Sequence, residues 1–249
     1  MEQFTISIAG RAVNVSAPSA SAREYCESYL CDAKPELSVE LISQDIAFEQ
    51  NAIDRERAYE GLPARKMENY LLERTALQRK IAEKLFEFDT LLFHGSVVAV
   101  DGEGYLFTAK SGTGKSTHTR LWREMLGDRA VMVNDDKPFL QVRSDSVQVY
   151  GSPWNGKHKL GNNIDVPLKA ICILERGEQN EICRITAKEA VPMLLQQSNR
   201  PQQSRLLPKY LDLLEQIAEK TAFYRLKCNM DPEAALISYQ TMSRDVKEK

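Results

Sequence analysis

Residues 106–117 read LFTAKSGTGKST, and this stretch decides the fold class. An apolar run ending at Thr108 enters a glycine-rich turn, and a helix-compatible segment leaves it. The turn holds the Gly114-Lys115-Ser116 core of the phosphate-binding pattern G-x-x-x-x-G-K-[ST] and an additional Gly112, while Ala109 replaces the first glycine. Alanine can adopt β or helical angles, so the pattern is weakened but not broken. The stretch predicts a strand, a phosphate loop and a helix; the alternative is a glycine turn before a surface helix.

Glycines in such a loop let successive backbone N–H groups point at phosphate oxygens, and the helix that follows adds the positive end of its dipole. Lys115 is expected to reach the β- and γ-phosphates of ATP, and the Ser116 hydroxyl to ligate Mg²⁺. The expected nucleotide-binding residues are Ser111, Gly112, Thr113, Gly114, Lys115, Ser116 and Thr117.

A second candidate group follows the next apolar run, Val131–Val133, which ends in Asn134-Asp135-Asp136. Carboxylates at a strand end beside a phosphate loop suit a second Mg²⁺ anchor. A metal anchor requires only one of the two adjacent acids. One can therefore face the metal while the other takes a proton from an alcohol acceptor. Alternatively, one of the two is a turn residue or a helix cap.

Glycine and histidine are concentrated around these motifs. Nine of the twelve glycines and all three histidines lie between positions 94 and 161. His94 ends a strand-like run and could approach the carboxylates, although a lone strand histidine is more often structural. His118 is expected on the helix surface or in packing.

The loop 151–163 is glycine-rich, aromatic and basic. This composition suits a mobile lid carrying Lys157, His158 and Lys159, or simply a solvated basic loop. Arg176 could clamp phosphate or stand in a surface turn.

The rest of the chain reads as alternating strands and helices, so the fold class is α/β, with hairpin-like pairs that make the sheet mixed. Residues 1–88 form a small α+β region: a hairpin around Ala9-Gly10-Arg11, a helix capped by Ser21, a strand at 37–42 and a long amphipathic helix over 66–88. Residues 89–249 form the catalytic core, closing with a helix from Pro232.

Composition excludes several classes. The 33 basic and 35 acidic residues give a net charge of -2, so we expect no nucleic-acid or membrane partner held by bulk charge. There is no run of about 18 apolar residues, no secretory signal at the N-terminus and no metal-ligand spacing among the five cysteines. We therefore expect a cytoplasmic, reduced protein.

Together, Phe93-His94-Gly95, the 111–116 loop and Asn134-Asp135-Asp136 resemble the HPr kinase/phosphorylase catalytic domain and its relatives, over about residues 91–245. The resemblance implies a mixed-sheet P-loop kinase core related to phosphoenolpyruvate carboxykinase. It implies that Lys115 and Ser116 hold nucleotide and Mg²⁺, that Asp135 is the acid/base paired with His94, and that Asp136 is the metal partner. The shorter N-terminal region and the absence of a glycine-arginine signature after the carboxylates disfavour HPr itself as the acceptor.

The leading hypothesis is an ATP-dependent kinase that phosphorylates a serine-type hydroxyl on a small precursor peptide, a protein or a metabolite. A nucleotide-binding sensor or scaffold without phosphotransfer is the alternative, and a carboxykinase-type metabolite enzyme is a lesser one. The acceptor and the oligomeric state stay open, a homo-oligomer being one option.

Overall fold

The structure is a computed structural model that describes residues 1–244, and it divides into two compact units, Met1–Glu87 and Phe88–Lys249. Each unit has its own sheet and its own buried residues. The glycine loop and the Asp135-Asp136 pair both fall in the second unit.

The first unit is built on a three-stranded sheet. Strands β1 (Glu2–Ile8) and β2 (Arg11–Ala17) form the expected antiparallel hairpin, and β3 (Leu37–Glu40) runs parallel to β2. The hairpin turn has positive φ at Ala9 and Gly10, as a tight primed turn requires. Phe4, Ile6 and Ile8 alternate into the buried face, which explains why the period-two pattern was readable.

The helices of this unit differ more from expectation. They are α1 (Ala20–Tyr25), the short η1 (Glu27–Tyr29), α2 (Ser43–Tyr59) and α3 (Asn69–Leu85), followed by η2 (Phe86–Phe88). The expected capping box at Ser21 is wrong: the N-cap is Ser19, whose hydroxyl donates to Glu73 and accepts no hydrogen bond from the helix backbone. Helix α3 begins three residues later than expected and ends at Leu85.

The second unit contains a nine-stranded sheet, and this sheet is mixed, as the sequence predicts. Its order is β4-β8-β9-β10-β6-β5-β7, and β12 pairs with both β10 and β11. The strands are β4 (Thr90–Leu92), β5 (Ser96–Val100), β6 (Glu103–Thr108), β7 (Ala130–Asn134), β8 (Phe139–Val142), β9 (Val147–Tyr150), β10 (Asp165–Arg176), β11 (Glu181–Ile185) and β12 (Ala222–Cys228).

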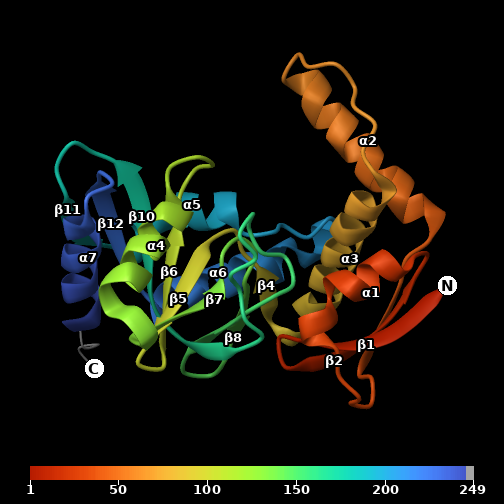
Figure 1. The fold of residues 1–249 in the computed structure, drawn as a ribbon, viewed down its shortest axis with the longest axis horizontal. Coiled ribbons are helices and arrows are strands. Elements are labelled where there is room, and N and C mark those ends of the chain that lie inside the picture. Colours follow the sequence, from red (N-terminus) through yellow and green to blue (C-terminus); the bar gives the residue numbers. More distant parts are fainter. Residues whose placement is uncertain (245–249) are drawn as a thin grey trace. The chain divides into compact units, whose positions relative to one another are not determined.

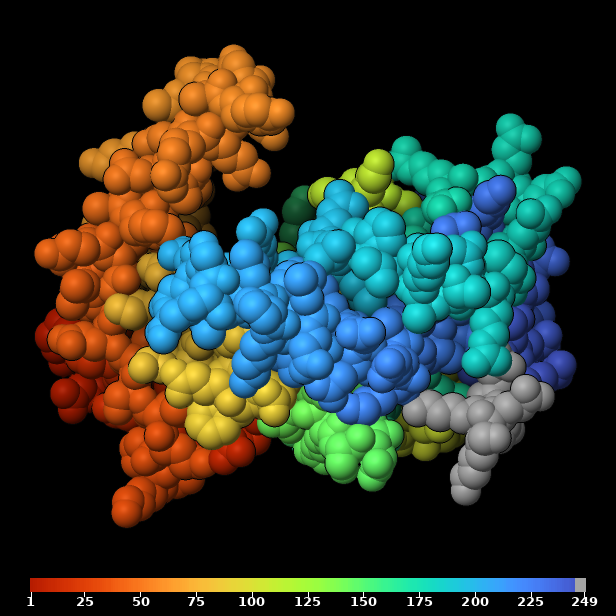
Figure 2. All heavy atoms as spheres, turned by 180° about the vertical axis from the view of Figure 1, so that it is seen from behind, coloured from red at the N-terminus to blue at the C-terminus, as the bar shows by residue number. Residues whose placement is uncertain are grey.

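Helices cover both faces of this sheet. They are α4 (Lys115–Leu126), α5 (Ala187–Gln197), α6 (Leu207–Lys220) and α7 (Pro232–Arg244), with short 3₁₀ turns η3 (Gly127–Arg129) and η4 (Ser204–Leu206). Helices α4 and α7 pack together over one face, around the fully buried Trp122 (Figure 1). Helices α5 and α6 cover the other face, coloured cyan to blue in Figure 2. None of the helices within residues 1–244 is long and apolar enough to cross a bilayer.

Strand direction places several motifs at one edge. Strands β6, β10 and β12 are parallel, and β7 runs the same way because both β6 and β7 are antiparallel to β5. The carboxyl ends of all four strands therefore meet at the same edge of the sheet, where the amino end of β5 also lies. In open α/β sheets this is the edge at which ligands bind.

Candidate functional site

The glycine loop connects the carboxyl end of β6 to α4, as the sequence predicts. Gly112 has φ +74° and Gly114, the N-cap of α4, has φ +116°, values that side-chain-bearing residues rarely adopt. A Cβ at either position would meet no atom within 4 Å, so glycine is required here for backbone conformation and not for space. Ala109 is fully buried in the core and is not among the residues with positive φ, so the pattern's first position does not need glycine here.

Lys115 is the first residue of α4, and its ammonium lies over the loop. Nζ donates to the carbonyl of Ala109 at 3.3 Å. Burial lowers the pKa of Lys115, the nearby Lys137 lowers it further, and Asp136 and Asp135 act in the opposite direction. The ammonium is thus half-buried and in the field of both carboxylates, at the end of the helix where anions bind.

Asp135 is buried, only 4% exposed, and connects to the start of α4 through two hydroxyls. Its Oδ1 accepts from Ser96 Oγ at 2.8 Å, Ser96 Oγ lies 3.1 Å from Thr119 Oγ1, and Thr119 donates to the carbonyl of Ser116 at 3.2 Å. The other carboxylate oxygen, Oδ2, is buried and has no hydrogen-bond partner among the described residues. A buried carboxylate oxygen without a donor is costly, so it marks a place for a proton or a cation.

His94 contacts Asp136 and not Asp135. Its Nε2 lies 3.3 Å from Asp136 Oδ1, and its backbone N–H donates to the carbonyl of Gln197. The structure thus places His94 beside Asp136, whereas the family resemblance implies a pairing with Asp135. Although burial raises the pKa of Asp136, the hydrogen bond from His94 and the charges of Lys137 and Lys115 outweigh it, and the pKa is lowered. Asp136 is thus held as a carboxylate beside Lys115.

Two residues that sequence reasoning missed shape this corner. Asn134 Oδ1 accepts from the backbone N–H groups of Asp136 and Lys137, at 2.8 and 2.6 Å, and so turns the chain at the end of β7. Lys137 is half-buried, and burial lowers its pKa, partly offset by Asp136. Its place directly after the two acids was the available signal.

Arg176, at the carboxyl end of β10, reaches the glycine loop. Its Nη2 donates to the carbonyl of Gly112 at 2.6 Å. The parallel pairing of β10 with β6 explains this contact, since it brings both carboxyl ends together. The structure thus shows Arg176 in contact with the glycine loop, and its contact with phosphate stays a prediction.

The basic loop 151–163 is anchored at its base instead of being free along its length. Residues 151–154 are buried, Ser152 Oγ donates to the carbonyl of Lys137, and Asn162 donates to carbonyls of β7. Gly156 lies against Asp135, since a Cβ there would come within 2.8 Å of Oδ2. The exposed tip carries Lys157, His158 and Lys159. The structure thus brings the start of this loop to the carboxylates and leaves its three basic residues at the surface.

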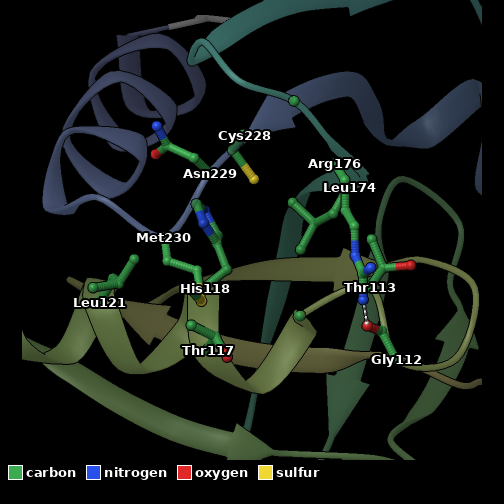
Figure 3. A pocket seen from close by; sticks show the side chains of 12 residues that line it. Gly112, Thr113, Thr117, His118, Leu121, Leu174, Arg176, Cys228, Asn229 and Met230 are labelled. Atoms are coloured by element: carbon green, nitrogen blue, oxygen red, sulfur yellow. Dashed lines mark hydrogen bonds between the residues drawn. The ribbon is translucent and has the colours of Figure 1, made fainter.

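A cavity of about 470 Å³ adjoins the glycine loop, on the side of Gly112, Thr113 and Thr117 (Figure 3). His118 lies in its wall and is 3% exposed, so of the two expectations for this residue packing is correct. Burial lowers its pKa to about 4. The remaining walls come from β10 and from the segment after β12, which no short motif could have linked to the loop.

The described residues contain no cluster of three or more His, Cys, Asp and Glu side chains that could enclose a metal ion. The hard oxygen ligands near the loop are the exposed Ser116 hydroxyl and the Asp136 carboxylate. This set fits Mg²⁺, which is usually held by one or two protein oxygens together with substrate phosphates and water.

Comparisons with known proteins give a family match and distant structural likenesses. Residues 62–235 match the family described as SynChlorMet cassette protein ScmC. A search of curated proteins finds no significant match. Among solved structures, the chain is similar to the Hpr(Ser) kinase/phosphatase from Coxiella burnetii, at 13% identity and a TM-score of 0.36, over 61% of this chain and 93% of that one.

A TM-score of this size does not show a shared site. The family match is different in kind, because it spans well over half of the sequence, from residue 62, which lies before α3 in the first unit, to the start of α7. The chain therefore belongs to the family of SynChlorMet cassette protein ScmC.

Proposed function

We propose that this protein is an ATP-dependent kinase that transfers the γ-phosphoryl group to a serine-type hydroxyl of a small precursor peptide, a protein or a metabolite. One observation carries the proposal: a single sheet edge holds a loop with two positive-φ glycines, the half-buried Lys115 and two carboxylates. Of these carboxylates, Asp135 is buried, and Asp136 is held ionised beside His94 and Lys115. Phosphoryl transfer depends mainly on positioning and charge neutralisation, which this set of groups supplies.

In this proposal the loop and Lys115 bind the phosphates of ATP. The backbone N–H groups from Ser111 to Thr117 surround the phosphate oxygens, and Lys115 exchanges its present contact with Ala109 for the β- and γ-phosphates. Arg176, already within hydrogen-bond distance of the loop at Gly112, adds a second cation. Lys157 and Lys159, at the exposed tip of the 151–163 loop, remain candidates for contact with an acidic acceptor.

Mg²⁺, when bound, would neutralise developing charge on the phosphates, and Ser116 and Asp136 are the residues to hold it. The structure changes the role proposed for His94. Because its Nε2 contacts Asp136, His94 is a positioning residue that orients this carboxylate, since carboxylates that ligate metals are commonly held by a hydrogen bond from a neighbouring group.

Asp135 is the proposed general base. Ser96 fixes its Oδ1, and Oδ2 is left without a donor, so Oδ2 can accept the hydroxyl proton. The acceptor oxygen then forms a bond to the γ-phosphorus while the bond to the β,γ-bridging oxygen breaks, and ADP leaves with the electron pair. Gly156 covers Oδ2, so the 155–161 segment has to shift for the acceptor to reach it.

The test is transfer of label from γ-labelled ATP, with Mg²⁺, to serine, to synthetic peptides and to host-cell extract. We expect one class of acceptor to gain phosphate, and Asp135→Asn to lose at least about 100-fold in transfer rate while still binding ATP. Asp128→Asn, an exposed acid after α4, is the matched control and should keep the wild-type rate. Tight ATP binding without label on any acceptor would favour the sensor alternative instead.

A further inference from the structure

The cavity beside the glycine loop is enclosed by three segments that lie far apart in the sequence. Its floor is the first half of α4, its side wall is the end of β10 around Leu174, and its cover is the segment Cys228–Met230 after β12. Figure 3 shows His118 rising from α4 toward this cover, with Arg176 and Gly112 on the opposite side. The volume of about 470 Å³ falls in the range typical of small-molecule sites, roughly 300–1,000 Å³.

The side chains around this space are mainly apolar. Leu121, Leu174, Cys228 and Met230 contribute hydrocarbon or sulfur surface, and Met230 is 77% exposed at the rim. Such a lining suits a flat, uncharged ring system and does not suit a phosphate. Thr117, which the cavity shares with the loop, joins this apolar space directly to the place proposed for the phosphates.

His118 supplies the polar group of this wall. Its Nε2 lies 3.1 Å from Ser238 Oγ, which also accepts from Trp122 Nε1 at 2.9 Å and donates to the carbonyl of Ala234 at 2.8 Å. We assign the single Ser238 proton to a helix carbonyl, that of Ala234 or Ala235, so that Nε2 of His118 is the donor in its contact. Nδ1 is then a bare acceptor that is buried from solvent and has no hydrogen-bond partner among the described residues, so a ligand in the cavity reaches it only when the imidazole or its neighbours shift.

From these observations we infer that the cavity binds the base of the nucleotide and that His118 Nδ1 selects a purine with an amino group at position 6. The inference rests on the proposed function, because it takes the phosphates to lie in the glycine loop. An amino group donates to the bare Nδ1, whereas the 6-oxo group of hypoxanthine would oppose one acceptor with another.

Met230 and Leu174 would then contact the faces of the ring, in the manner of apolar walls around other aromatic ligands. The preference for a 6-amino base arises because a polar atom without a hydrogen bond costs more in a buried place than in water, where solvent replaces the missing partner. The phosphate loop contributes affinity for every nucleotide alike, while the cavity determines which base is accepted.

The experiment measures dissociation constants for ATP, ITP and inorganic tripolyphosphate, each with Mg²⁺. In the wild-type protein we expect ATP to bind at least about tenfold more tightly than either ITP or tripolyphosphate. Cys228→Phe, which fills the cavity, should reduce ATP affinity to that of tripolyphosphate and leave tripolyphosphate affinity unchanged. Cys183→Phe, the same substitution at an exposed cysteine outside the cavity, should behave as wild type.

His118→Phe tests the acceptor itself. It should bring the ATP to ITP affinity ratio close to one, and unchanged tripolyphosphate affinity would show that the loop is intact. Alkylation gives an independent readout: ATP should protect Cys228 from iodoacetamide and tripolyphosphate should not, with Cys183 as the internal reference.

The outcomes separate this inference from the proposed function. Equal wild-type affinity for ATP and tripolyphosphate, or wild-type ATP affinity in Cys228→Phe, would overturn the cavity assignment and leave the phosphate loop standing. Equal affinity for ATP and ITP would overturn the role of His118. Failure of the wild-type protein to bind either ATP or tripolyphosphate would overturn both proposals.

Discussion

Acidification should destabilise the protein through His118, and the size of the effect follows from its environment. The imidazole is 3% exposed, and burial lowers its pKa to about 4, against an ordinary value of about 6.5 in an unfolded chain. The unfolded state therefore binds a proton first as pH falls. The contribution of neutral, buried His118 to the free energy of unfolding is fully present above pH 6.5 and is lost as pH falls from 6.5 toward 4.

The magnitude comes from the two pKa values. The full loss is about 3 kcal/mol, and about 2 kcal/mol of it falls between pH 7 and pH 5, where carboxylates with ordinary pKa values hardly titrate. His118→Gln removes the titrating group and keeps a side chain able to hydrogen-bond Ser238. The free energy of unfolding of this variant should therefore depend on pH less steeply than that of the wild type, by about 2 kcal/mol over this interval.

The assay is equilibrium urea unfolding at pH 7 and pH 5, followed by the fluorescence of Trp122, whose indole lies in the same buried group as His118. His158→Gln, at the exposed tip of the 151–163 loop, is the control and should retain the wild-type dependence. The reasoning would be refuted if His118→Gln lost as much stability between pH 7 and pH 5 as the wild type, because His118 would then not be buried as a neutral group.

Two further predictions concern the glycine loop and the His94–Asp136 contact. Gly114→Ala places a side chain at φ +116°, which costs about 1–3 kcal/mol of backbone strain. This variant should weaken tripolyphosphate binding about tenfold or more. The control is Gly127→Ala, at φ +56° beyond the other end of α4, which should lower stability without changing tripolyphosphate affinity. His94→Gln should raise the Mg²⁺ concentration needed for half-maximal phosphotransfer several-fold, while Mg²⁺-free ATP binding stays as in wild type; an unchanged Mg²⁺ requirement would argue against the positioning role.

The local parts of the site could be predicted from the sequence. Strand β6, the loop and α4 are contiguous, so their order follows from a short motif, and the carboxylates directly end an apolar run. The mixed character of the sheet was also readable, because hairpin turns such as Asp101-Gly102 stand between apolar runs.

Which carboxylate meets which partner could not be predicted. The pairing of β5 with β7 shifts register between Val97 and Val98, so that Val97 faces Asn134 while Val98 faces Met132. A shift of one residue decides which of two adjacent acids faces Ser96 and which faces His94, and it leaves no mark in the sequence.

Helix α2 was missed for a different reason. Its sequence is mostly polar and lacks a clear apolar stripe, so periodicity gave no signal. Within the first unit it is joined to α3 by ion pairs, in which Arg79 contacts Asp45 and Glu49 at 3.2 and 2.7 Å. Charge patterning of this kind becomes visible only when the two helices are seen side by side.

The central claim is that the loop at residues 111–117 binds nucleotide phosphates, and calorimetric titration with Mg²⁺ and ATP tests it most directly. Lys115→Ala should lose about tenfold to 100-fold in affinity, because a charged hydrogen-bond donor to phosphate is removed. Lys110→Ala, an exposed lysine of the same loop, should stay within about twofold of wild type. Equal ATP affinity in Lys115→Ala and wild type would contradict the account.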